Sequence, residues 1–150
     1  RVLVAGGDVQ DDRVEVEVVG FGEGDESWSI GYQTFLGDPG EKDIWEDVKD
    51  WLARYWQTED GQEMRVRAAC IDSGGHHTQA VYAFCKANRK RLWFPVKGWN
   101  QPGKPVITGP TITKPLGARL YHVGTDTAKD QLLSQLNTID ACAPLMPNVS

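Results

Sequence analysis

The sequence predicts an α/β fold, with a central mixed sheet of three antiparallel strands followed by parallel strands and helices on both faces. Over residues 2–20, an apolar run and an alternating run flank a polar turn, which is the pattern of a strand hairpin. Apolar residues then recur at spacings of three and four over 42–57, predicting an amphipathic helix. A second apolar run at 66–71 predicts a strand after that helix. A right-handed crossover would make this strand a parallel neighbour of the first.

The remaining elements are predicted by the same periodicities. Residues 27–36 alternate large apolar side chains, as expected of a third antiparallel strand. Further elements are predicted in this order: a helix over 77–89, a strand over 92–97, a strand over 119–123 and a helix from about residue 125. Residues 98–118 are rich in Gly, Pro and Thr and predict a long loop, which in a compact domain is usually functional or mobile.

Composition limits the class of protein. A chain of 150 residues with 40% hydrophobic content suits one domain with a real core. No apolar run is long enough to cross a membrane, and the N-terminus lacks a signal-peptide pattern. The three cysteines have no metal-ligand spacing, which favours a reducing, intracellular setting. Because the chain starts on a strand without an initiator Met, we expect a domain excised from a longer protein.

The net charge of −5 is unevenly distributed. Residues 1–72 hold 18 of the 21 acids, whereas residues 73–119 hold none and carry eight Lys or Arg. This acid-free segment is interleaved with aromatic residues and could contact phosphates, although a solvated basic face is the alternative. The candidate DNA-binding cations in it are Lys86, Arg89, Lys97 and Lys104, and we expect them to face the same side as Asp8 and Asp72 or to border it. Because the whole chain is acidic, any contact with nucleic acid has to be local.

Two aspartates mark the ends of buried strands. Asp8 comes near the end of the first strand, and Asp72 directly follows the strand at 66–71. If these strands lie side by side, the two carboxylates converge at the carboxyl edge of the sheet, where ligand sites of α/β sheets occur. Carboxylates held that close repel unless a cation lies between them, and hard cations such as Mg²⁺ favour oxygen ligands. The alternative is that each Asp only caps a turn.

Several motifs resemble the nuclease domain of the large terminase subunit of lambda-like tailed phages, an RNase H-like fold. These motifs are GDVQDDR at 7–13, IDSGGH at 71–76, VYAFC at 81–85 and VGTDTAKD at 123–130. The resemblance runs from about residue 2 to residue 137, so we expect a nuclease domain at 1–137. Residues 138–150 depart from the family and are expected to be a divergent or truncated tail.

The resemblance implies a metal-dependent DNA endonuclease that cuts concatemeric viral DNA during genome packaging and uses two Mg²⁺ or Mn²⁺ ions. Asp8 and Asp72 match the family's first two metal-binding acids by position. In the two-metal scheme one ion activates water and the other stabilises the leaving oxygen, so Asp8 would bridge both ions and Asp72 would hold one. Additional site candidates are Asp126, Asp130 and His76, and Lys129 is a further DNA-binding candidate. Solvated histidine and helix-capping Asp126 are the structural alternatives.

The resemblance also implies partners and a location. The partners are double-stranded viral DNA, an N-terminal packaging ATPase domain, the small terminase subunit and the portal, with no membrane, in the host bacterial cytoplasm. The family's third acid is expected on a helix near its C-terminus, and this chain stops before such a stretch, so feeble activity or none is expected of it. Two alternatives stay open: a catalytically silent DNA-binding or assembly remnant of a prophage terminase, and another RNase H-like nuclease.

Overall fold

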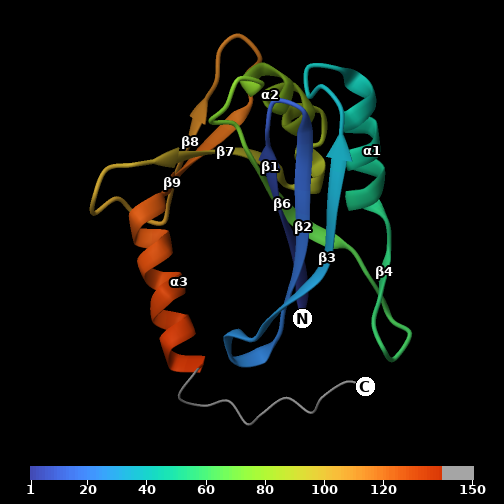
Figure 1. Ribbon diagram of the computed structural model, residues 1–150, viewed down its shortest axis with the longest axis vertical. Helices are drawn as coiled ribbons and strands as arrows, with labels where there is room; N and C mark the ends of the chain where they lie inside the picture. Colours follow the sequence, from blue (N-terminus) through green and yellow to red (C-terminus); the bar gives the residue numbers. More distant parts are fainter. Residues whose placement is uncertain (140–150) are drawn as a thin grey trace.

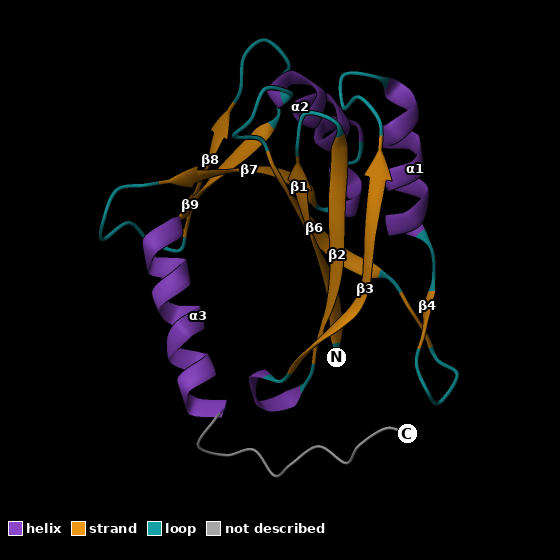
Figure 2. Cartoon of the chain, viewed as in Figure 1, coloured by secondary structure: helices purple, strands orange, loops and turns teal. Residues whose placement is uncertain are grey.

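The structure is a computed structural model that describes residues 1–139. Its first half contains β1 (Val2–Val9), β2 (Arg13–Phe21), η1 (Glu23–Asp25), β3 (Ser27–Leu36), α1 (Lys42–Ala53), β4 (Trp56–Gln57), β5 (Glu63–Met64) and β6 (Val66–Asp72). Its second half contains α2 (Thr78–Ala87), η2 (Arg89–Arg91), β7 (Trp93–Trp99), β8 (Ile107–Ile112), β9 (Arg119–Gly124) and α3 (Thr125–Ile139). Figure 1 labels these elements, and Figure 2 distinguishes helices from strands.

One sheet of seven strands organises the molecule, in the order β3-β2-β1-β6-β7-β9-β8. The strands β1, β2 and β3 form an antiparallel meander. The strands β1, β6, β7 and β9 are all parallel neighbours, and β8 pairs antiparallel with β9 at the edge. The predicted mixed α/β class is therefore confirmed, including the parallel pairing of the first strand with the strand that ends at Asp72.

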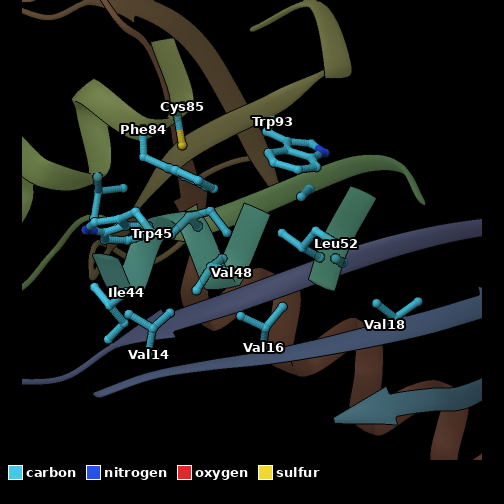
Figure 3. Packing of buried hydrophobic residues seen from close by; sticks show 14 of the residues in the cluster. Val14, Val16, Val18, Ile44, Trp45, Val48, Leu52, Phe84, Cys85 and Trp93 are labelled. Atoms are coloured by element: carbon cyan, nitrogen blue, oxygen red, sulfur yellow. The ribbon is translucent and has the colours of Figure 1, made fainter. Parts of the chain in front are cut away.

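The core lies between one face of the sheet and helices α1 and α2. Because strand side chains alternate, β2 directs every second residue into this core. The α1 residues that meet them recur at helical spacing. The main members, seen together in Figure 3, are Val14, Val16 and Val18 of β2, Ile44, Trp45, Val48 and Leu52 of α1, Phe84 and Cys85 of α2, and Trp93 of β7. Burial of this face leaves the other face of β1 and β6 free for polar groups.

Helix α3 follows β9 directly and lies on the other side of β1 and β2 from α1 (Figures 1 and 3). Its leucines at 132, 133 and 136 are about half exposed, so α3 is not buried as α1 and α2 are. No helix within residues 1–139 is long and apolar enough to cross a membrane.

The helix predicted over 42–57 is shorter than expected, since α1 ends at Ala53. Arg54 is extended, and Trp56 lies in β4, where it pairs with Met64 of β5. The Trp56 ring packs edge-on against Trp51 at 5.1 Å and fills the space beside Gly31, where a Cβ would come within 2.6 Å of it. Tertiary packing of Trp56 therefore overrides the helical spacing that included it.

The prediction of a long loop over 98–118 is wrong in two places. The strand β7 continues to Trp99, and β8 occupies Ile107–Ile112. All six residues of β8 are exposed, so no alternation of polar and apolar burial marks it. Its register with β9 also shifts between Thr108 and Thr111. Pairing with β9 alone defines this edge strand, which explains why periodicity missed it.

Candidate active site

Asp8 and Asp72 lie on neighbouring parallel strands and on the same face of the sheet. The register pairs Gly6 with Cys70 and Gly7 with Ile71, so Asp8 and Asp72 come next on the two strands. Adjacent strands are about 4.8 Å apart, which places the two Cα atoms at roughly that separation. Asp8 is exposed and Asp72 half-buried. Both side chains project from the face opposite α1 and α2, because Val9 and Ile71, which flank them, pack on the core side.

The segment that follows Asp72 is held rigidly against β7. Ser73 is buried, and both its backbone N and its Oγ donate to the carbonyl of Val96 at 2.8 Å. The Gly74 N–H donates to Oδ1 of Asp72 at 3.0 Å, which fixes the orientation of this carboxylate. Thr78 Oγ1 lies 2.8 Å from the carbonyl of Ser73 and fastens the start of α2. The sequence analysis did not identify Ser73 as the residue that anchors this segment to β7. The one signal in the sequence was its position directly after Asp72.

The turn that follows Asp8 is tied to the loop that follows Asp72. Gln10 Nε2 donates to Oδ2 of Asp8, and His76 Nδ1 lies 2.9 Å from Oδ1 of Asp11. This hydrogen bond and the charge of the imidazole lower the pKa of Asp11 below its usual 3.8. His76, named above as an additional site candidate, therefore bridges the β1–β2 turn and the β6–α2 loop. Neither Gln10 nor Asp11 was predicted as part of the site. The partner of Asp11, His76, is 65 residues away in sequence, and a Gln two residues after an Asp carries no specific signal.

No cation compensates the two aspartates within residues 1–139. Neither Asp8 nor Asp72 forms an ion pair there. Glu15 is the cross-strand partner of Asp8, but its carboxylate accepts a hydrogen bond from Arg13 Nε at 3.2 Å. Within the same residues, no group of three or more His, Cys, Asp or Glu side chains could hold a metal. The described site therefore contains two available carboxylates and no third ligand.

The acidic candidates on α3 do not join this pair. Asp126 and Asp130 are exposed and lie in the first two turns of α3, as does the exposed Lys129. This helix follows β9, which is two strands away from β6 in the sheet, or about 10 Å at the usual strand spacing. Thr125, the first residue of α3, places Oγ1 3.3 Å from the carbonyl of Trp99. The structure therefore separates Asp126 and Asp130 from Asp8 and Asp72.

The four basic candidates of the acid-free segment fall at two ends of the sheet. Lys97 lies near the carboxyl end of β7 and Lys104 beyond it, where the Lys104 ammonium sits 4.2 Å from the Trp99 ring centroid. Lys86 and Arg89 lie at the far end of α2, which runs back from the Asp72 loop toward the amino ends of the strands. Lys86 and Arg89 are therefore not beside the aspartates, contrary to the expected placement on their side.

The paired carboxylates fit a hydrated hard cation. Mg²⁺ is commonly held by one or two carboxylates, with waters and substrate phosphates completing its six ligands. Among the thiols of residues 1–139, Cys70 is the one beside the pair: it precedes Asp72 by two residues on the same face. Loss of hydration at its sulfur raises the Cys70 pKa, so this thiol stays protonated near neutral pH although the residue is exposed. The donor set is thus one of oxygens, which suits Mg²⁺ or Mn²⁺ rather than a soft metal.

Comparison with known proteins identifies the family. Residues 1–146 match the family described as terminase large subunit gpA, endonuclease domain. The chain belongs to this family. It is also similar to the large terminase subunits of Escherichia phage lambda and Enterobacteria phage P21, with 35% identity to each. The predicted resemblance to lambda-like terminases is confirmed.

The terminase nuclease domain described here corresponds to a part of those relatives. The alignments cover 133 and 134 residues, which are 89% of this chain but only 21% of each relative. No solved structure matches the chain significantly. The assignment therefore rests on sequence, and the sheet topology agrees with it.

Replacing His76 with Ala should raise the pKa of Asp11 back toward 3.8, because the hydrogen bond and the nearby imidazole charge are removed. A folded-state pKa below the unfolded value stabilises the protein above about pH 3.8 and loses that effect as the pH falls through the folded pKa. Both side chains are mostly exposed, so the stability change should be small. An NMR titration of the Asp11 carboxyl carbon measures the shift. His122→Ala on β9 should leave it unchanged, and an unaltered Asp11 pKa in His76→Ala would contradict the bridge.

Proposed function

We propose that this chain is the part of a phage large terminase subunit that cuts double-stranded DNA in a metal-dependent reaction during genome packaging. The observation that carries the proposal is the pair of uncompensated carboxylates, Asp8 and Asp72, in register on adjacent parallel strands of a terminase nuclease domain. A charged phosphodiester cannot approach two carboxylates without a cation between them. The arrangement is therefore suited to phosphate chemistry only with a divalent metal.

Asp8 and Asp72 would hold the metal through their carboxylate oxygens. A bound divalent ion would neutralise charge on the phosphate and lower the pKa of a bound water. The hydrogen bonds from Gln10 and Gly74 orient the two carboxylates before any ion arrives. A second ion needs a further ligand, and within residues 1–139 no third acid lies beside the pair.

The proposed partners follow from the whole terminase. They are concatemeric viral DNA as substrate, a packaging ATPase domain in the same polypeptide, the small terminase subunit and the portal. We place the reaction in the cytoplasm of the host bacterium. Support comes from the relatives, which are named large terminase subunits in two phages.

A second candidate function is a catalytically silent DNA-binding or assembly module of a prophage terminase. One observation favours it: residues 1–139 contain no third metal ligand beside Asp8 and Asp72. The presence of both strand-end aspartates, without a neutralising cation in the described part of the chain, favours the active enzyme instead.

Plasmid nicking tests the proposal. The chain and a longer version that includes the rest of the polypeptide are incubated with supercoiled plasmid in Mg²⁺, in Mn²⁺ and in EDTA. We expect the longer version to nick the plasmid with either metal and to be inactive in EDTA, whereas the 150-residue chain should be feeble because two acids hold a second ion poorly. Undiminished nicking in EDTA would exclude a metal-dependent reaction. Failure of the longer version with both metals would favour the silent module.

A further inference from the structure

A basic pocket lies at the end of the sheet that is remote from the two aspartates. Its volume is about 470 Å³, and it is bounded by the end of α2, by η2 and by the starts of β7 and β9. Four cations line it: Lys86 of α2, Arg89 and Lys90 of η2, and Arg119 of β9. Its apolar lining includes Phe94 and Ile112. Separate segments therefore bring four positive charges into one concavity.

The charge of this pocket is not neutralised within the described chain. All four cations are exposed, and none of them forms an ion pair with any residue of 1–139. The segment 73–119 that supplies them contains no Asp or Glu. In a protein with a net charge of −5, such a local concentration of positive charge attracts anions to one place.

The cations are not needed to cap the helix. Lys and Arg are often found near helix C-termini because they interact with the unpaired carbonyls there. In α2, however, Asn88 takes that role: its backbone N–H is bonded to the carbonyls of Phe84 and Cys85, and its Nδ2 donates to Phe84 at 2.9 Å. Helix capping therefore does not account for Lys86 and Arg89.

The walls of the pocket are fixed by tertiary contacts. Tyr82 of α2 packs with Ala118 and Leu120 in a second small core, which holds the β8–β9 connection beside α2. Leu92, which directly follows η2, has a left-handed backbone conformation with φ 60°, unusual for a residue other than Gly. Its carbonyl accepts a hydrogen bond from the Ala69 N–H at 3.1 Å. The basic turn of η2 is thus anchored to β6 and held in place against the pocket.

We propose that this pocket binds the phosphodiester backbone of duplex DNA outside the position of cleavage. The helix α2 starts just beyond Asp72 and ends at the pocket, and its 10 residues span about 15 Å. Arg guanidinium groups bind phosphate oxygens in a bidentate manner, and lysines add point charges.

The proposal rests on the proposed function for its ligand, duplex DNA, but not on cleavage. Because the pocket is separate from Asp8 and Asp72, DNA held there needs no metal. The pocket would position the duplex and supply affinity that does not depend on base sequence, since backbone contacts carry no sequence information.

Binding in EDTA tests the pocket. The anisotropy of two unrelated fluorescein-labelled 30-bp duplexes is measured against the whole chain over a range of NaCl concentrations. For Lys86→Glu/Arg89→Glu we expect affinity to fall at least tenfold for both duplexes. The slope of log affinity against log salt should become shallower by about two, since each lost phosphate contact changes it by about 0.9. Circular dichroism checks that both reversals, at exposed positions, leave the fold intact.

A matched control changes the same charge elsewhere. Lys42→Glu/Lys49→Glu reverses two exposed cations of α1 and should leave binding and salt slope nearly unchanged. An equal loss in this control would mean that only net charge matters and would overturn the proposal. So would unchanged binding in Lys86→Glu/Arg89→Glu, absence of duplex binding by the unmodified chain in EDTA, or displacement of the duplex by micromolar ATP.

The nicking assay separates the two proposals. Metal-dependent nicking without pocket-dependent binding would leave the endonuclease proposal standing and remove the pocket. Pocket-dependent binding without nicking, in both the chain and its longer version, would support the pocket and the silent module together.

Discussion

Replacing Asp8 with Asn is expected to abolish DNA cleavage in a longer, active version of the chain. Asn keeps the shape of the side chain but removes the negative charge that would hold a divalent cation. Loss of an outer-shell partner alone typically lowers metal affinity or activity 10–100-fold, so loss of a direct ligand should reduce the nicking rate by more than about 100-fold. Stability should hold or rise, because two repelling carboxylates become one.

Three measurements make this prediction specific. The nicking rate is compared with that of Asp47→Asn, which removes an equal charge from an exposed position on α1. Thermal unfolding followed by circular dichroism checks the fold. Calorimetric titration with Mn²⁺ should show binding by the unmodified protein and much weaker binding by Asp8→Asn. A normal cleavage rate in Asp8→Asn would refute the nuclease assignment of this site.

Replacing Trp93 with Ala is expected to destabilise the protein by about 3–5 kcal/mol, the usual cost of truncating a buried Trp. Trp93 is only 1% exposed, and its ring stacks against Phe84 at 5.7 Å. Phe84 in turn contacts the ring of Trp45 at 4.7 Å, so one chain of aromatic contacts joins β7, α2 and α1. Because natural domains are stable by only about 5–15 kcal/mol, this loss is a large fraction of the total.

Urea unfolding measures the loss, and Trp93→Phe is its matched control. No residue within 1–139 accepts a hydrogen bond from the buried Nε1 of Trp93. Trp93→Phe therefore keeps an aromatic ring against Phe84 and removes an unsatisfied donor, so it should cost clearly less than Trp93→Ala. Equal losses in the two variants would mean that the ring stack contributes little.

Local sequence patterns determined much of the fold. The alternation in β2 and the apolar runs of β1 and β6 define which face of each strand is buried, because a strand has a side-chain period of two. The break between β6 and α2, marked by Gly74 and Gly75, then places Asp72 at a strand end. Together these patterns located Asp8 and Asp72 on neighbouring strands, and the register confirmed it.

Edge pairing and aromatic packing were decided only by the tertiary structure. The strand β8 is exposed along its whole length, so its identity depends on β9, which lies beyond it in sequence. The end of α1 depends on Trp56, whose ring fits beside Gly31 on a strand more than 20 residues earlier. In both cases the deciding free energy comes from a distant partner, which local periodicity does not contain.

The candidate functional groups divide in the same way. Asp8 and Asp72 could be predicted because each stands at a strand end, where the chain itself dictates position. The bridge between His76 and Asp11, the anchoring of Ser73 on Val96 and the gathering of Lys86, Arg89, Lys90 and Arg119 could not. Sequence reasoning placed Lys86 and Arg89 with the aspartates, whereas α2 carries them to the opposite end of the sheet. A helix that returns along a sheet moves its last residues about 1.5 Å per residue away from its first, and only the folded chain shows what they meet there.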